Sequence, residues 1–213
     1  MLQGTWSYEP LERPGHPFRA RGLAYVSALK YVDGPLPGGR RAFLEALGTS
    51  EDAAFYDQIF IVAGDYDVSP LLRLYVVAAA IEKTPLAAFI EERARWSGSS
   101  DSKGLWKPSL HGATPEDVAA KLHFAFNRYF PPCHAQPLNA ERETFSGELS
   151  LIPTCMNGLY TASTLGFYRG ALDGVGATGV HVDWERPIAS GMHGGTKIER
   201  LRFTVTWKGD KTR

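Results

Sequence analysis

The stretch RLRFTVTW (residues 200–207) decides the fold class. Apolar residues occupy every second position in it, at Leu201, Phe203, Val205 and Trp207, and polar residues fill the positions between them. Successive side chains point to opposite faces of a β-strand, so the pattern predicts a strand with one buried face and one face toward water. Strands with one wet face are typical of antiparallel or mixed sheets that are covered on one side.

Working outward from this strand, two earlier stretches show the same alternation. One runs from Val180 to Trp184, and the other alternates Phe145, Gly147, Leu149 and Leu151 with Ser146, Glu148 and Ser150. Between them, residues 157–172 carry apolar side chains at helical spacing and predict a helix. A glycine-rich turn at residues 190–195 precedes the last strand. The predicted order is therefore strand, helix, strand, strand, with the last two strands forming an antiparallel hairpin.

The predicted helix over residues 157–172 contains Gly166 and Gly170 at i, i+4 spacing. Glycines at this spacing lie on one face of a helix and leave room for a close neighbour. We expect this face to pack against the sheet.

The first 130 residues predict a helical part. Three segments place a hydroxyl residue before a proline, a helix-start signal, at Ser69-Pro70, Thr84-Pro85 and Thr114-Pro115. Two earlier helices are predicted over residues 23–33 and 38–47. The acidic segment Asp65-Tyr66-Asp67 is interpreted as a solvated turn before one of these helices.

These elements predict a single α+β domain in which an N-terminal helical half packs on a C-terminal mixed or antiparallel sheet. We expect an N-terminal extension over residues 1–18 and the domain over residues 19–207. The helical part would cover residues 19–136 and the sheet part residues 137–207, followed by a basic tail at 208–213.

Composition excludes several function classes. The chain has 213 residues, of which 44% are hydrophobic, and this is enough for a sizeable core and too apolar for intrinsic disorder. The 23 basic and 23 acidic residues cancel, which argues against a nucleic-acid partner. The start lacks a secretory pattern and no apolar segment is long enough to cross a bilayer, so we expect a cytoplasmic protein without a membrane partner.

Catalytic and metal-binding signatures are weak. The six histidines form no metal-binding pair on a helix, and the adjacent Cys133 and His134 are interpreted as part of a loop. Cys155 is expected to be a buried structural thiol, and His193 a turn residue. We therefore predict no catalytic residue and no metal site, and a cysteine-dependent enzyme stays as an open alternative.

Aromatic residues give the candidate ligand site. Aromatic side chains recur along the predicted helices, at Tyr66, Tyr75, Phe124, Phe126, Tyr129, Phe130, Tyr160, Phe167 and Tyr168. Such side chains build a core with polar tips, and such cores can enclose a ligand cavity. The candidate ligand-binding residues are Phe126, Tyr129, Tyr160, Phe167 and Tyr168.

Several motifs carry a resemblance to a known family. They are Arg19-Ala20-Arg21-Gly22-Leu23, the segment DYDVSPLLRL (residues 65–74), TPEDVA (114–119), RYF (128–130), FYRGAL (167–172) and a final strand ending at Trp207. Together they resemble the DUF2378 family, a set of paralogues of similar length found in myxobacteria. The resemblance covers residues 19–207, but its motifs are structural and it implies no function.

The element order also resembles, more distantly, haem-nitric-oxide-binding (H-NOX) and 4-vinyl-reductase-type sensory modules. This resemblance implies a ligand held between a helical part and a sheet. In haem-binding members a helix supplies a proximal His and a Tyr-x-Ser-x-Arg strand holds the haem carboxylates. The corresponding strand at residues 145–150 has neither Tyr nor Arg, so the cofactor is left open, with His111 and His123 as candidate axial ligands.

The function that follows is a non-catalytic sensory or regulatory module that binds a small apolar ligand between helices and sheet. A protein–protein interaction module is the alternative, with an exposed sheet face or the apolar helix from Pro70 as its homodimer or signalling-partner surface. A haem-binding gas sensor is a further alternative.

Overall fold

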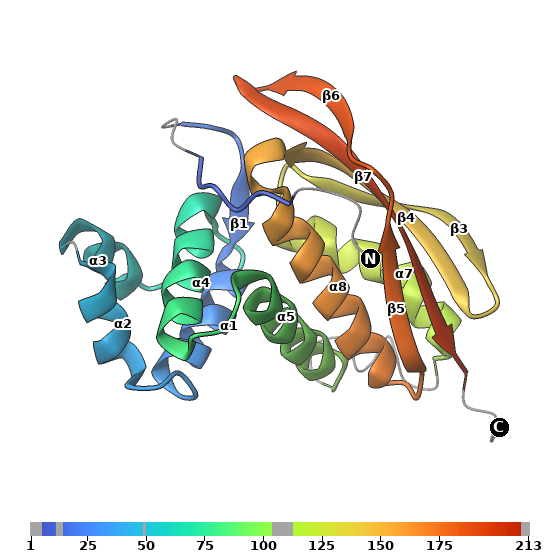
Figure 1. Cartoon of the computed structure of the whole chain (residues 1–213), viewed down its shortest axis with the longest axis horizontal. Helices are drawn as coiled ribbons and strands as arrows, with labels where there is room; N and C mark the ends of the chain where they lie inside the picture. The colour runs from blue at the N-terminus through green and yellow to red at the C-terminus, as the bar shows by residue number, and fades with distance from the viewer. Residues whose placement is uncertain (1–5, 12–14, 49, 104–112, 210–213) are drawn as a thin grey trace.

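The computed structural model describes residues 6–11, 15–48, 50–103 and 113–209. Helices form the N-terminal half and a twisted antiparallel sheet forms most of the C-terminal half, as Figure 1 shows. Helix α8 lies between the sheet on one side and α5 on the other. The predicted α+β class, with a helical half packed on an antiparallel sheet, is confirmed.

The sheet is built on the strand that the alternation predicted. Its order is β3-β4-β7-β5, with β6 also paired to β7, and all pairs are antiparallel. The strand bounds are β3 His134–Glu141, β4 Thr144–Pro153, β5 Thr178–Trp184, β6 Ile188–His193 and β7 Thr196–Lys208. The predicted order of strand, helix, strand, strand was incomplete, because β3 precedes β4 and β6 lies between β5 and β7.

Two of the predicted loops are strands. Residues 134–136, placed in a loop that includes Cys133 and His134, begin edge strand β3, so the sheet part starts earlier than residue 137. The predicted turn at residues 190–195 is mostly β6, and the turn itself is Gly194-Gly195. His193 is therefore a strand residue, and its ring lies 5.8 Å from that of Phe18.

The alternation of β4 breaks near its end. Phe145 and Leu149 are buried as predicted, but Leu151 is half-buried, because a bulge between residues 149 and 152 shifts the register. Glu148, expected on the wet face, is buried. Arg202 Nε donates to Glu148 Oε2 at 2.8 Å, and Arg200 lies 3.8 Å from the same oxygen, so guanidinium groups cover the carboxylate.

The helices largely follow the predicted starts. Their bounds are α1 Gly22–Asp33, α2 Gly39–Leu47, α3 Ser50–Asp57, α4 Val68–Glu82, α5 Leu86–Lys103, α7 Pro115–Tyr129 and α8 Asn157–Asp173, with a 3-10 turn η1 at Thr154–Met156. Thr114 caps α7 in a reciprocal capping box with Asp117, as its Thr-Pro signal predicted. For α4 the cap is Asp67, whose carboxylate accepts from Ser69 N at 2.7 Å, so Ser69 is inside the helix. Helix α3 was not predicted.

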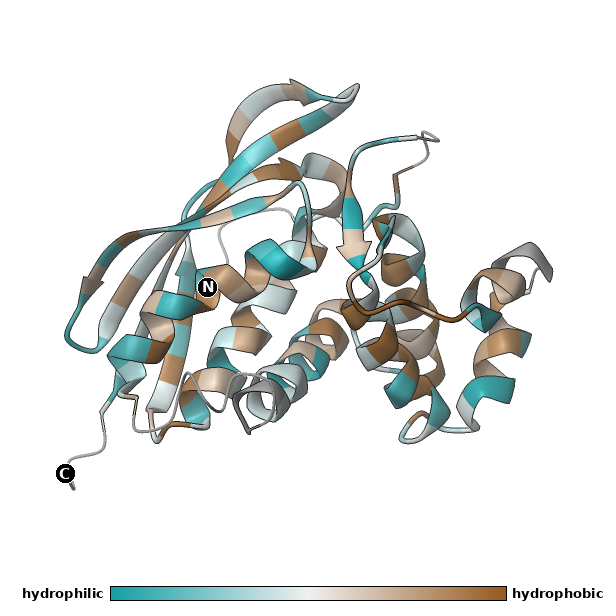
Figure 2. Cartoon of the chain, turned by 180° about the vertical axis from the view of Figure 1, so that it is seen from behind, coloured by the Kyte–Doolittle hydropathy of each residue, from teal (hydrophilic) through white to brown (hydrophobic). Residues whose placement is uncertain are grey.

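The segment Asp65-Tyr66-Asp67, interpreted as a solvated turn, is strand β2 (Asp65–Asp67). It pairs antiparallel with β1 (Arg19–Arg21), and Arg21 Nη1 lies 2.8 Å from Asp65 Oδ1. The connection from α3 to β2 is the continuous brown stretch in Figure 2. Within it Ile59, Ile61 and Val62 are 90%, 67% and 54% exposed.

The glycines of α8 pack against a helix instead of the predicted sheet. A Cβ added at Gly166 would lie 2.0 Å from the carbonyl oxygen of Glu91, and one at Gly170 would lie 1.9 Å from that of Arg95. Gly98 of α5 meets Phe167 of α8 in the same way. The three glycines therefore let the backbones of α5 and α8 approach each other directly.

The segment before residue 19 packs on the body where it is described. Ser7 N donates to Asn157 Oδ1 and Glu9 N donates to the Cys155 carbonyl, both at 2.7 Å, while Phe18 is fully buried. In the described ranges no helix is both long and apolar enough to span a membrane.

Candidate functional site

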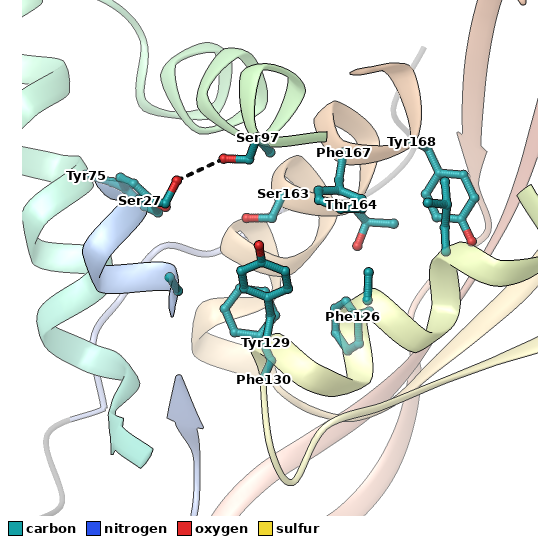
Figure 3. Close-up of a pocket in the computed structure, with 14 residues that line it drawn as sticks. Ser27, Tyr75, Ser97, Phe126, Tyr129, Phe130, Ser163, Thr164, Phe167 and Tyr168 are labelled. Atoms are coloured by element: carbon teal, nitrogen blue, oxygen red, sulfur yellow. Dashed lines mark hydrogen bonds between the residues drawn. The ribbon is translucent and has the colours of Figure 1, made fainter. Parts of the chain in front are cut away.

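A cavity of about 70 Å³ lies among the helices. Its walls come from α1, α4, α5, α7 and α8, as Figure 3 shows, and no sheet strand contributes a lining residue. The sequence placed the cavity between helices and sheet. This cavity lies elsewhere, among the helices, while Tyr168 of α8 also packs on Phe145 and Phe203 of the strands, so the predicted location stays a prediction.

Four of the five candidate ligand-binding residues line this cavity: Phe126, Tyr129, Phe167 and Tyr168. Tyr160 does not line it, because its ring lies fully buried behind Phe130, at a centroid distance of 5.2 Å. Phe124, counted among the core aromatics, is 57% exposed. Whether the four lining residues bind a ligand stays a prediction.

Hydroxyl groups line the cavity alongside the aromatic rings. Sequence analysis did not single out Ser27, Ser97, Ser163 and Thr164, which carry no periodic signature. Ser27 Oγ and Ser97 Oγ form a hydrogen bond of 3.2 Å between α1 and α5, the dashed line in Figure 3. Burial raises the pKa of Tyr75 to about 12, so its phenol remains protonated and polar at neutral pH.

Two of the buried hydroxyls have no partner among the described residues. Thr164 Oγ1 and Tyr168 Oη are both enclosed, on residues 5% and 4% exposed, and neither makes a hydrogen bond there. A buried polar group without a partner destabilises the fold by about 1–3 kcal/mol. Since both residues line the cavity, a ligand that accepts a hydrogen bond would offset this cost.

The described histidines do not line the cavity. His111 is outside the described residues, and His123 of α7 packs its ring on Phe124 at 3.9 Å without lining the cavity. His134 and His181 are exposed, as the alternation predicted for His181. Among the described side chains, no three His, Cys, Asp or Glu residues are grouped to hold a metal ion.

A cluster that sequence analysis missed joins His16, Asp67 and Ser69. His16 Nε2 lies 3.1 Å from Asp67 Oδ1 and 3.5 Å from Ser69 Oγ. In a hydrolytic triad the carboxylate and the hydroxyl bind opposite nitrogens of the ring, whereas here both face the same nitrogen. Ser69 Oγ also accepts from Leu11 N at 3.1 Å, so the cluster fastens the N-terminal segment to α4.

The two thiols are poorly placed for nucleophilic chemistry. Burial raises the pKa of Cys133 to about 12, and its Sγ donates to the Leu151 carbonyl at 3.3 Å. Cys155 is half-buried, not buried as expected, and burial raises its pKa as well. A thiol reacts as its thiolate, so a raised pKa slows reaction.

Alkylation by iodoacetamide at pH 8 should therefore be slow at both cysteines and slowest at Cys133. With a pKa of about 12, roughly one Cys133 thiol in ten thousand is ionised at that pH. Peptide mass spectrometry over a time course measures each site, with the urea-unfolded chain as the control. Labelling of Cys133 at the rate of the unfolded chain would contradict the burial described above.

Comparison with solved structures places the fold. A Cs H-NOX domain carrying the unnatural amino acid 4-cyano-L-phenylalanine matches with a TM-score of 0.64 at 12% identity, covering 91% of this chain and 99% of that chain. The fold is an H-NOX-like fold. A point variant of the T. tengcongensis H-NOX protein gives 0.63 at 14% identity (90% and 99% covered). An oxygen-binding H-NOX domain related to soluble guanylate cyclases gives 0.60 at 12% identity (91% and 97% covered).

No protein-family model and no curated protein matches the chain. The distant H-NOX-like similarity expected from the element order is therefore confirmed for the fold, while the DUF2378 resemblance rests on its motifs alone.

The described residues do not fit the haem that this fold suggests. Protein side chains fill the space beside the inward face of strand 145–150. Phe145 packs on Tyr168 at a ring distance of 5.8 Å, and a Cβ on Gly147 would lie 2.8 Å from the Phe203 ring. The cavity is about half the size of an engineered cavity of roughly 150 Å³ that holds benzene. A porphyrin contains four pyrrole rings and is far larger than benzene, so this cavity among the described residues has no room for haem.

Proposed function

We propose that this chain is a small-molecule sensory module of H-NOX-like fold, whose ligand occupies the helical cavity directly, without haem. The observation that carries the proposal is the Thr164 hydroxyl, which lines the cavity without a partner among the described residues. Buried hydroxyls are normally hydrogen-bonded, so the Thr164 hydroxyl is free to bond a molecule in the cavity.

The cavity limits the ligand's size and chemistry. Its volume of about 70 Å³ admits a short chain in preference to an aromatic ring, by comparison with the benzene-sized cavity of roughly 150 Å³. Aromatic walls from Phe126 and Phe167 favour an apolar body, and the Thr164 and Tyr168 hydroxyls favour one hydrogen-bond acceptor on it. The ligand is therefore small, largely apolar and carries an acceptor.

Replacing Thr164 with Val tests the role of its hydroxyl. Val has nearly the shape of Thr, so Thr164→Val removes an unpartnered hydroxyl and should stabilise the free protein by about 1 kcal/mol. Thr161→Val is the matched control on the same helix: its hydroxyl donates to the Asn157 carbonyl at 3.1 Å. Loss of that bond should lower the free energy of unfolding by about 1 kcal/mol. Urea unfolding measures both, and equal signs would contradict the assignment of Thr164.

Ligand binding itself is tested by a thermal-shift screen of short-chain alcohols, ketones and acids, followed by calorimetry. We expect the purified protein to lack a haem absorption band, a short-chain compound to raise the melting temperature, and Thr164→Val to weaken that effect. A haem band in protein purified after expression with added haem precursor, or the absence of any stabilising compound, would overturn the proposal.

We also propose membership of the DUF2378 family and a cytoplasmic location. The family is supported by the motifs at residues 19–23, 65–74 and 167–172. The location is supported by the free thiols Cys133 and Cys155, because cytosolic proteins keep their thiols reduced.

An interaction module is the second candidate, favoured by the connection between α3 and β2. Ile59, Ile61 and Val62 are exposed there, whereas α4, the apolar helix from Pro70, turns most of its apolar side chains into the core. Adjacent exposed apolar side chains are typical of contact surfaces. Size-exclusion chromatography with light scattering tests the homodimer, and a strict monomer at high concentration would exclude it.

A further inference from the structure

A second, smaller pocket adjoins the cavity. It shares Ser27, Tyr75 and Ser97 with the cavity, so these side chains form the wall between the two spaces. Arg93 and Trp96 of α5 line its other side, and its volume is about 10 Å³. Figure 3 shows Ser27, Ser97 and Tyr75 grouped together at this end of the cavity.

Arg93 is the charged group of this small pocket. Its guanidinium carbon lies 3.9 Å above the ring of Tyr31, and the side chain is half-buried. Partial burial lowers the pKa of Arg93, while the charges of Glu82, Glu92 and Tyr75 act in the opposite direction.

Two other arginines at the α5–α8 crossing are paired, in contrast with Arg93. Arg95 donates to Asp173 at 2.8 Å, and Arg169 forms an ion pair with Glu91. Arg93 makes no ion pair with any described residue, although it is less exposed than Arg95. A guanidinium that is stacked on an aromatic ring and lacks a carboxylate presents its N–H fork to an incoming anion.

We propose that the two pockets form one site for a short-chain carboxylic acid, with the carboxylate on Arg93 and the apolar chain in the cavity. The inference rests on the proposed function and names its ligand class. The small pocket is about 10 Å³, close to the space of one water, so an anion there has to be small, and a planar carboxylate needs less space than a tetrahedral phosphate. The chain would pass the wall at Ser27 and Ser97, whose single hydrogen bond of 3.2 Å is the contact that has to open.

The recognition follows from charge and shape. A guanidinium binds a carboxylate through two parallel N–H···O bonds, which are stronger than bonds between neutral groups. Tyr31 holds the guanidinium plane in place, so little freedom is lost when the acid binds. An alcohol of equal length would fill the cavity but leave Arg93 without a partner.

The experiment measures calorimetric affinities for straight-chain acids from acetate to hexanoate, each beside the alcohol of equal length, at constant ionic strength. We expect the best acid to bind at least about tenfold more tightly than its alcohol. Arg93→Gln should lower the affinity for the acid by about tenfold to a hundredfold and change the affinity for the alcohol by no more than about twofold. Arg95→Gln is the matched control, because it removes an equal charge from the same helix outside both pockets.

The outcomes distinguish failure of the carboxylate site from failure of the proposed sensory function. Alcohols that bind as tightly as the acids, or acid binding that Arg93→Gln leaves unchanged, would overturn the carboxylate site while the sensory proposal stands. Failure of every acid and alcohol to bind would overturn both. If circular dichroism shows that Arg93→Gln does not fold, Arg93→Lys replaces it. Lys keeps the positive charge but cannot form the two parallel hydrogen bonds of a guanidinium, so the affinity for the acid should fall by about three- to tenfold.

Discussion

Leu201→Ala is expected to lower the free energy of unfolding by about 2–5 kcal/mol. Leu201 is fully buried on β7, the strand that pairs with β4, β5 and β6 and thus holds the sheet together. Truncation removes the transfer free energy of the side chain and leaves a cavity that its neighbours fill only in part. Urea unfolding followed by circular dichroism measures the loss.

Thr204→Ala on the same strand is the control. Thr204 lies on the opposite face, half-exposed, so its truncation should change the free energy of unfolding by about 0.5 kcal/mol or less. Similar losses at both positions would mean that the two faces of β7 are equally buried, contrary to the alternation on which the fold assignment rests.

That alternation could be predicted because burial on one face leaves a period of two in the sequence. Helix α7 could be predicted equally well, because the Thr114 hydroxyl accepts a hydrogen bond from a free backbone N–H of the first turn and Pro115 has a backbone angle that suits it. In both cases local chemistry and tertiary burial point the same way, so a single sequence is sufficient.

The strands that were missed leave no such pattern. Edge strand β3 is exposed at nearly every position, and β6 is exposed or half-buried throughout. Both are held by hydrogen bonds to a neighbouring strand, β4 and β7 respectively. Backbone pairing does not depend on side-chain identity, so neither strand could be recognised before its neighbour was known.

The cavity residues likewise include some that the sequence could predict and some that it could not. Aromatic residues of α7 and α8 such as Phe126 and Phe167 could be selected because large apolar side chains gather in cores. Ser27 and Ser97 could not, because serines are common on surfaces and only the crossing of α1 and α5 brings these two within 3.2 Å. Tyr160 lies outside this cavity, since a sequence pattern does not show how deeply a side chain lies behind its neighbours.

The paired glycines of α8 show the limit most clearly, and they carry the second large effect. The i, i+4 spacing indicated a close approach, but the sheet was the wrong partner. Gly170→Ala would place its Cβ 1.9 Å from the Arg95 carbonyl oxygen of α5, a backbone atom that moves only if the helix moves. We expect the free energy of unfolding to fall by about 1–3 kcal/mol, as in other overpacked cores.

The sign of this change makes the experiment decisive, because Ala normally stabilises a helix interior by about 1 kcal/mol relative to Gly. Gly34→Ala is the control: Gly34 ends α1 at a φ of −120°, and its Cβ would meet only the Lys30 carbonyl oxygen, at 3.4 Å. Urea unfolding should show little change there. The same helices supply Ser97 and Thr164 to the cavity, so Gly170→Ala should also lower the affinity for any ligand bound between them. A Gly170→Ala protein more stable than the parent would show that α5 and α8 do not pack backbone to backbone.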